Sequence, residues 1–335
     1  MTDVLSHKRF WDEQAAYDWV EAHLWPDGPV CPRCGQIKER ITKLKGKSTR
    51  IGVYKCKDCR KPFTVKVGTI FEDSHIPMRM WLQAIALLAA SKKGISSNQL
   101  HRMLGITLKS AWFMSHRIRE AMREGSLKPP MGGAGGIVEV DETIYGRAAT
   151  HPKGRGPLMR RGITNSAHKN VVLSLVERGG EVRSWHVAGS TVAEVIPVVE
   201  ANVAKETAVM TDKAQLYRYR LRRRFASHDT VDRSQQEYAR YEKGRPVIHT
   251  NTVEGYFALF KRGMRGTYQH CKEKHLHRYL AEFDFRYNTR VRLGIDDQQR
   301  AAKALVGAKG KRLTYRTTAG IRRSAAGVEP EAPPY

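Results

Sequence analysis

Four short runs of β-branched and other apolar residues follow one another in the second half of the chain. They predict β-strands at about 137–145, 171–177, 182–188 and 207–211. The segment at 190–203, STVAEVIPVVEANV, lies between the last two runs and has a helical pattern that contains one proline. Strands and helices in this order favour a mixed β-sheet with helices packed on it.

The residues before this sheet have a different pattern, in which helical periodicity flanks a short segment with paired cysteines. The stretch KPPMGGAGG is dense in proline and glycine, so it cannot hold a helix or a central strand and is a linker. The sequence therefore predicts a multidomain α/β protein. Its parts are an N-terminal helix at 1–25, a cysteine module at 26–68, a helical region at 69–127, the linker at 128–136, the sheet domain at 137–295 and a basic, partly disordered tail at 296–335.

Two helices separated by a turn are predicted inside the helical region. Ser96 followed by Gln99 is a capping-box start, and Gly105 provides the turn before a second helix from about Thr107. The inward faces carry apolar side chains: Leu100, Met103, Leu104, Ala111, Met114, Ile118 and Met122. The other face of the second helix carries side chains suited to a DNA major groove and its phosphates: Lys109, Phe113, His116 and Arg117. This pattern favours a helix-turn-helix, although any antiparallel helix pair looks similar.

The amino-acid composition indicates the kind of molecule that this protein binds. The 335 residues include 59 Lys and Arg against 33 Asp and Glu, a formal net charge of +26. Such a field attracts polyanions, and its spread along the whole chain favours nucleic-acid binding over a basic tail or a solubility device. The longest apolar run, 84–90, is far shorter than the ~20 residues that span a bilayer, and the N-terminus has no signal core. We therefore expect a cytoplasmic, DNA-associated protein without a membrane partner.

The cysteines indicate a metal site. Cys31 and Cys34 form one CxxC turn, and Cys56 and Cys59 form a second. Each turn points two thiolates at one centre, and two turns complete a tetrahedral four-cysteine site for one structural Zn²⁺ ion. A redox CxxC motif and a pair of disulfides are the alternatives. Redox motifs come singly near a βαβ unit, and disulfides do not suit the expected compartment.

Acidic residues at the ends of apolar runs indicate a second, different metal site. Asp141 and Asp212 each end a predicted strand, and Glu254 lies on a predicted helix from about Thr252. Two carboxylates at strand ends with a third on a later helix can hold two divalent ions for phosphoryl transfer. Oxygen ligands select Mg²⁺ or Mn²⁺. The alternative is that each acid only caps a turn. Lys261 follows Glu254 by ~10 Å along the helix axis, where it can hold a DNA phosphate.

Five motifs together resemble the bacterial insertion-sequence transposases that combine an N-terminal zinc ribbon, a helix-turn-helix and a DDE catalytic domain with an RNase H-like fold. The motifs are the cysteine module, GTIFEDSHIPMRMWLQAI with the helices after it, VEVDETIYG, MTDKAQLY, and HTNTVEGYFALFKRGMRGTYQH with HLHRYLAEFDFRYNTR. The resemblance covers roughly residues 10–295. It implies that Asp141, Asp212 and Glu254 are the catalytic acids, with Asn251 orienting a water or a carboxylate. Strand alternation places Glu139 on the face of Asp141 and Glu142 on the other, and either remains a possible helper.

The resulting hypothesis is a transposase that binds the terminal inverted repeats of its element, cuts the DNA and joins it to a target. We expect a homo-oligomer assembled on DNA. Further cations are expected on phosphates: Arg147, Lys153, Arg155, Arg160 and Arg161 in the loop between the first two strands, and Lys261, Arg262 and Arg265 on the Glu254 helix. The segment 218–245 is an insertion that could grip transposon ends. The rival hypotheses are a structure-specific endonuclease and a DNA-binding regulator with an inactive nuclease domain.

Overall fold

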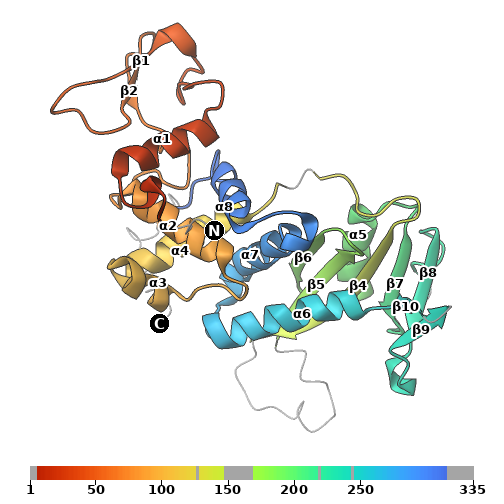
Figure 1. Ribbon diagram of the computed structural model, residues 1–335. Coiled ribbons are helices and arrows are strands. Elements are labelled where there is room, and N and C mark those ends of the chain that lie inside the picture. The colour runs from red at the N-terminus through yellow and green to blue at the C-terminus, as the bar shows by residue number, and fades with distance from the viewer. Residues whose placement is uncertain (1–5, 126–127, 147–168, 218–219, 243–244, 315–335) are drawn as a thin grey trace, which may run out of the picture. The chain divides into compact units, whose positions relative to one another are not determined.

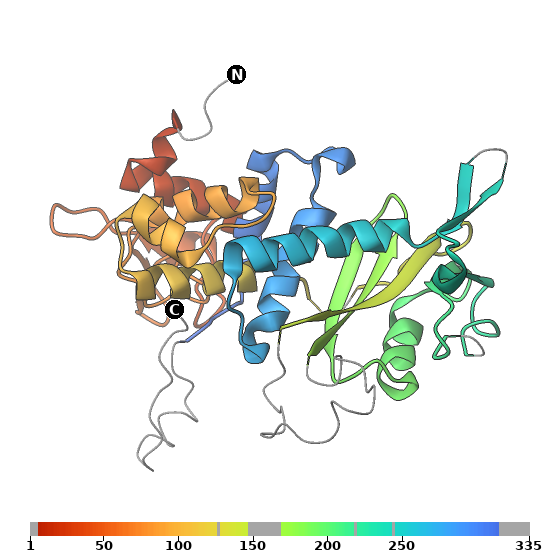
Figure 2. The same cartoon turned by 90° about the horizontal axis from the view of Figure 1, so that it is seen from below.

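The computed structural model describes residues 6–125, 128–146, 169–217, 220–242 and 245–314 (Figures 1 and 2). Contacts divide the chain into two compact units. Unit 1 is Met1–Glu124 together with Thr289–Tyr335, and unit 2 is Gly125–Asn288. No helix within the described ranges is both long enough and apolar enough to cross a membrane.

Unit 2 is built on a mixed five-stranded sheet in the order β6-β5-β4-β7-β8. Its strands are β4 (Ile137–Tyr145), β5 (Asn170–Glu177), β6 (Val182–Val187), β7 (Ala208–Asp212) and β8 (Ser227–Val231). β4, β5 and β6 pair antiparallel, whereas β4–β7 and β7–β8 pair parallel. The four predicted strands are confirmed. The fifth, β8, was not predicted because its sequence, SHDTV, is mostly polar and lacks an apolar run.

Helices cover both faces of this sheet, as Figure 1 shows. α5 (Val192–Asn202) packs on one face, against the side chains of Val138, Val140 and their neighbours. α6 (Asn251–Gly263) and α7 (Leu276–Asn288) pack on the other face, against Val172 and Val176. The alternation of side chains along β4 therefore decides which helices each residue meets. The architecture agrees with the predicted RNase H-like mixed sheet flanked by helices.

A two-stranded hairpin, β9 (Ala239–Glu242) and β10 (Arg245–His249), leads directly into α6. The predicted core stripe of α6 is confirmed, since the side chains of Val253, Tyr256, Phe257, Phe260 and Met264 are all buried. This apolar stripe fixes the rotation of the helix on the sheet, and so it fixes the direction in which the opposite, polar stripe points.

Unit 1 contains a small antiparallel sheet and a set of helices. The sheet is β1 (Ile41–Lys43), β2 (Tyr54–Cys56) and β3 (Pro62–Phe63). The helices are α1 (Glu13–Leu24), α2 (Met78–Ala90), α3 (Ser97–Leu104), α4 (Leu108–Met122) and α8 (Asp297–Val306). The tail prediction is wrong for the range of α8, because this helix packs against α2 and buries Ala304 and Leu305.

α3 begins and ends where the sequence predicts, and α4 begins where it predicts. The Ser96 hydroxyl accepts the Gln99 N–H at 3.1 Å, and the Thr107 hydroxyl accepts the Ser110 N–H at 3.2 Å. Gly105 ends α3 in the left-handed conformation, with φ 63° and ψ 25°, where glycine has no Cβ penalty. One predicted core residue is wrong: Met103 is 51% exposed.

The predicted outer face of α4 needs a larger correction. His116 and Arg117 are buried, so they do not form the expected DNA-facing surface. Arg117 Nη1 donates hydrogen bonds to the carbonyl oxygens of Ile70 at 2.8 Å and Glu72 at 2.7 Å. The Arg117 guanidinium also lies over the Phe113 ring, 4.6 Å from its centroid. Arg117 therefore has a structural role, joining α4 to the segment around Ile70 and Glu72. Lys109, near the start of α4, is exposed.

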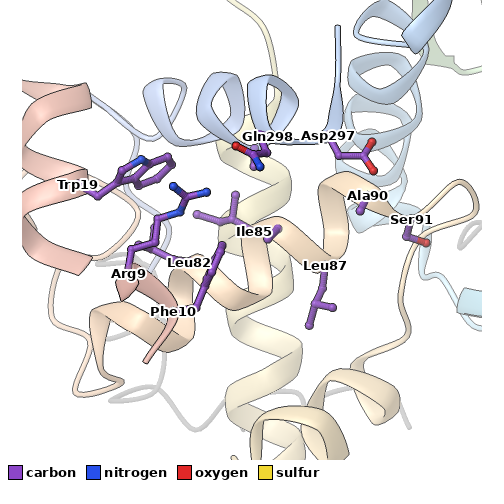
Figure 3. Close-up of a pocket in the computed structure, with 12 residues that line it drawn as sticks. Arg9, Phe10, Trp19, Leu82, Ile85, Leu87, Ala90, Ser91, Asp297 and Gln298 are labelled. Carbon is purple, nitrogen blue, oxygen red and sulfur yellow. The ribbon is translucent and has the colours of Figure 1, made fainter. Parts of the chain in front are cut away.

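A cavity of about 300 Å³ lies within unit 1 and is shown in Figure 3. Side chains from α1, α2 and α8 line it, and most of them are apolar. The Arg9 guanidinium lies over the rings of Phe10 and Trp19, 4.9 and 4.8 Å from their centroids. Burial lowers the pKa of Arg9. Asp297 and Gln298 close the cavity from the α8 side, so α8 belongs to the fold of this unit.

Candidate active site and metal centre

The two predicted aspartates lie on adjacent parallel strands. β4 and β7 pair in a register that sets Glu139 opposite Met210, and continuing it by two residues brings Asp141 level with Asp212. Asp141 Oδ1 accepts the Glu142 N–H at 2.8 Å, and Asp212 Oδ1 accepts the Ala214 N–H at 3.0 Å. These hydrogen bonds orient both carboxylates from their own backbones.

Glu254 comes to the same place from the first turn of α6, and an arginine connects it to Asp141. Arg233 Nη2 lies 2.6 Å from Glu254 Oε1 and 3.5 Å from Asp141 Oδ2. The same nitrogen donates to Thr250 Oγ1 at 3.1 Å, and the Thr250 hydroxyl donates to Glu254 Oε1 at 3.0 Å. The fold thus brings Asp141 and Glu254, which are far apart in sequence, to one cation, and Asp212 lies on the strand next to Asp141.

The pKa of Asp141 is raised, and nearby negative charge contributes to the shift. Burial raises the pKa of Asp141 to about 6, the Arg233 guanidinium opposes that rise, and Asp212 and Glu254 add to it. Carboxylates this close repel one another when ionised, and a bound cation relieves the repulsion. The donor set consists of carboxylate oxygens, which fits Mg²⁺ or Mn²⁺. These residues would therefore hold divalent ions of the predicted kind.

Glu139 has a different role from Asp141, although both lie on the same face of β4. Its fully buried carboxylate accepts the backbone N–H groups of Thr252 at 2.8 Å and Val253 at 3.0 Å, which belong to the first turn of α6. Helix N-termini leave such groups without intrahelical partners, and they favour negative charge. Glu139 therefore caps the helix that carries Glu254.

Arg178 completes this support. Its Nε donates to Glu139 Oε1 at 2.7 Å, its Nη1 to the Val247 carbonyl at 2.7 Å, and its Nη2 to the His249 carbonyl at 2.9 Å. One guanidinium thereby joins β4 to β10, the strand that runs into α6. Breaking a buried ion pair by removing one partner typically costs ~3–5 kcal/mol. The position of α6 on the sheet depends on this pair.

Glu142 lies on the opposite face of β4, as strand alternation predicts, and faces the α5 side of the sheet. Burial raises the pKa of Glu142 to about 7, its interaction with Tyr217 opposes that rise, and Asp141 and Asp212 add to it. Burial and the same glutamate raise the pKa of the Tyr217 hydroxyl well above its usual range. Tyr217 is fully buried, so the segment after Asp212 is attached to the sheet directly behind the carboxylates.

The remaining predicted residues divide into three groups. Lys261 is half-buried, and burial and Arg265 lower its pKa while Asp141 opposes the shift, so its ammonium group lies within electrostatic reach of Asp141. Arg262 and Arg265 are exposed. Asn251 is also exposed, and the residue of the preceding turn that bonds Glu254 is Thr250, not Asn251. The loop cations Arg147, Lys153, Arg155, Arg160 and Arg161 lie outside the described residues.

The four paired cysteines form a separate cluster in unit 1. Their sulfur atoms all lie within 4.8 Å of one another, with Cys31–Cys59 at 3.7 Å and Cys34–Cys56 at 3.5 Å. A tetrahedral Zn²⁺ ion with Zn–S bonds of ~2.3 Å requires sulfur atoms about 3.8 Å apart. The cluster therefore fits one structural zinc ion held by four thiolates.

Comparison with known proteins identifies the family of both domains. Residues 133–288 match the family model of the ISXO2-like transposase domain, a DDE domain, and residues 11–62 match that of the transposase zinc-ribbon domain. The chain belongs to the insertion-sequence transposases. A similar protein is an uncharacterized protein in transposable element ISH50 of Halobacterium salinarum, 26% identical over 291 residues, which make up 83% of this chain and 92% of that protein.

Sequence reasoning missed two residues of this transposase site and left a third undecided. Arg233 lies in a polar segment with no periodicity, so no local pattern connects it with Asp141 or Glu254. Arg178 stands in a turn after β5, where an arginine is ordinary. Glu139 stood out only by sharing a face with Asp141, and its helix-capping role follows from contacts across 113 positions of the chain.

Proposed function

We propose that this protein is an active DDE transposase, which binds the ends of its own element, cuts the DNA and joins the freed 3′ ends to a target. The observation that supports this most is the convergence of Asp141, Asp212 and Glu254 within a domain that matches the transposase family. The relative whose name places it in a transposable element supports the same assignment.

Each carboxylate has a defined part in this reaction. Asp141 and Asp212 would hold divalent ions from the strands, and Glu254 would hold them from α6. Divalent ions bound there supply activation of water and stabilisation of the attacking and leaving oxygens. Lys261, close to the same carboxylates, would bind a phosphate next to the scissile bond and so orient the DNA strand.

DNA binding is proposed to involve both units. In unit 1, the exposed Lys109 at the start of α4 and the zinc ribbon would contact the terminal repeats. In unit 2, Arg262 and Arg265 continue the positive charge of α6 beyond Lys261. We propose assembly of more than one copy on DNA, because a transposition event must cut two ends and join both.

The test of this proposal is the variant Glu254→Gln, which keeps the size of the side chain and removes its charge. We expect it to abolish nicking and joining of end DNA in Mg²⁺, because losing one metal ligand removes several kcal/mol of stabilisation. Binding of the same DNA in a gel-shift assay should remain. The matched control is Glu206→Gln, an exposed acid before β7 in the same unit, which should nick like the unaltered protein.

The same assays separate the rival functions. A structure-specific endonuclease would nick but never join a labelled 3′ end to target DNA. A regulator with an inactive domain would bind without nicking. Near-normal nicking by Glu254→Gln would show that the carboxylate assignment is wrong.

A further inference from the structure

The segment between β7 and β8 is short and strongly basic. One of its arginines pairs with an acid, whereas three others are exposed and make no such pair in the part of the chain that the structure describes. The segment begins directly after Asp212 and contains the run Arg220-Leu221-Arg222-Arg223-Arg224. Arg224 Nη1 pairs with Glu200 Oε2 on α5 at 2.7 Å. Arg220, Arg222 and Arg223 are exposed, and within the described residues their side chains make no hydrogen bond or ion pair.

Other cations of the same region are used inside the protein. Lys213 pairs with Asp232 at 2.7 Å, Arg233 with Glu254 at 2.6 Å and Arg240 with Glu237 at 2.6 Å. Acidic side chains nearby pair with Lys213, Arg233 and Arg240. The three arginines without such a pair among the described residues therefore leave their positive charge exposed to solvent. We call Arg220, Arg222 and Arg223 the arginine patch.

Buried side chains and backbone hydrogen bonds anchor the backbone of the arginine patch. Tyr217, Leu221 and Phe225 are buried in the core that α5 shares with the sheet. Backbone hydrogen bonds close the turns between them, from Arg220 N to Tyr217 O at 3.2 Å and from Arg224 N to Leu221 O at 3.0 Å. Arg220 and Arg222 are adjacent in sequence to the buried Leu221, and one residue separates Arg223 from the buried Leu221 and Phe225. This anchoring reduces the backbone entropy that is lost when the arginines bind a ligand.

The segment that carries the patch also lies next to one of the carboxylates in the chain. Tyr217 is buried in the core on the α5 side of the sheet, and the segment itself begins directly after Asp212, the last residue of β7. A polyanion bound to the patch would therefore pass close to the site proposed to cut it. Exposed guanidinium groups near the proposed phosphoryl-transfer site suit contacts with DNA backbone phosphates.

We propose that Arg220, Arg222 and Arg223 form a phosphate-binding site for the DNA backbone beside the active site. This inference rests on the proposed function for the identity of the polyanion. Contacts of this kind position the duplex and read no sequence, so the site should bind end DNA and unrelated DNA alike.

The experiment measures the salt dependence of binding for the full-length protein. The probes are a fluorescein-labelled duplex carrying an end of the element and a labelled duplex of mixed sequence, followed by fluorescence anisotropy at rising NaCl concentration. Each lost phosphate contact reduces the slope of log K against log[salt] by ~0.9. The triple variant Arg220→Gln, Arg222→Gln, Arg223→Gln should therefore lose about 2.7 of the slope with both probes, which is ~40-fold in relative affinity over a fourfold rise in salt.

Two further variants make the result specific to the patch. Arg222→Gln and Arg224→Gln each remove one positive charge from the same turn, but only the first removes a proposed phosphate contact. Arg222→Gln should flatten the slope by ~0.9 and Arg224→Gln should not. The triple change to lysine keeps the charges and should restore most of the slope.

The outcomes separate this inference from the proposed function. An unchanged slope in the triple glutamine variant, or equal losses in Arg222→Gln and Arg224→Gln, would overturn the arginine patch. A loss confined to the end duplex would also overturn it, because phosphate contacts do not distinguish sequences. Failure of the unaltered protein to nick end DNA would count against the proposed transposase activity and leave the measured slopes standing.

Discussion

The cysteine cluster and the carboxylate cluster proposed to bind divalent ions lie in different units, and they are built in opposite ways. The cysteine cluster comes from two CxxC turns within one short module, so all four of its ligands lie close together in the sequence. The carboxylate cluster comes from β4, β7 and α6, and it needs Glu139 and Arg178 to hold α6 in place. We therefore expect the cysteine cluster to depend on its zinc ion, whereas the carboxylate cluster depends on the buried support of α6.

The largest effect that can test this comparison is loss of zinc. Structural Zn²⁺ sites contribute ~10–16 kcal/mol to the folding of small modules. Cys56→Ser should therefore abolish zinc binding and leave residues 26–68 open to proteolysis. The Trp185 fluorescence transition should not change, because Trp185 is the one tryptophan among residues 125–288 and reports on unit 2. A protease-resistant Cys56→Ser ribbon would show that zinc is not its main support.

The next effect concerns the buried support of the carboxylate cluster. Glu139→Gln should cost ~3–5 kcal/mol of stability, because Arg178 loses its charged partner. It should also raise the Mg²⁺ concentration needed for half-maximal nicking, because α6 and Glu254 are less firmly placed. Unfolding in urea followed by Trp185 and a Mg²⁺ titration of nicking measure the two effects.

Glu282→Gln is the matched control for this variant. Glu282 is also fully buried and pairs with Arg286 and Tyr268, but it lies on α7 away from the N-terminus of α6. It should lose comparable stability with no change in Mg²⁺ dependence. Equal Mg²⁺ dependence in both variants would mean that Glu139 contributes to stability alone. Arg178→Lys tests the same support if Glu139→Gln does not fold.

A smaller effect follows from the pKa of Asp141. Burial raises it from 3.8 to about 6, so the folded state favours the neutral carboxyl. The raised pKa of Asp141 adds ~3 kcal/mol to the free energy of unfolding below about pH 4, and this contribution is lost as the pH rises through about 6. In EDTA, Asp141→Asn should therefore decline less in stability between pH 4 and pH 7 than the unaltered protein. Parallel curves of stability against pH would contradict the raised pKa.

The smallest effect concerns the cation that bridges the carboxylates. Arg233 and Glu254 are partly exposed, and such pairs contribute ~0.2–1 kcal/mol. Because the guanidinium occupies oxygens that would bind metal, Arg233→Gln should lower the Mg²⁺ concentration for half-maximal nicking by up to about fivefold. Arg240→Gln, which breaks the pair with Glu237, is the control. A higher Mg²⁺ requirement in Arg233→Gln would show that Arg233 assists the reaction.

Features that depend on neighbours along the chain could be predicted from the sequence. Spacing predicted the cysteine cluster, short apolar runs predicted four strands of the sheet, and helical periodicity predicted the buried stripe of α6. The same periodicity predicted the wrong surface on α4. It assumes that a helix has one exposed face, but the C-terminal half of α4 is enclosed on all sides, so His116 and Arg117 are buried.

The roles of polar groups that are distant in sequence follow from the packed fold. Glu139 and Asp141 share a strand, a face and a charge, yet one caps α6 and the other joins the carboxylate cluster. Arg233 and Arg223 both belong to the polar segment 218–245, yet one bridges two acids and the other is exposed. The physical reason is that a charged group acts through whatever lies within a few ångströms of it. Contacts between residues more than a hundred positions apart exist only after the sheet and α6 have packed.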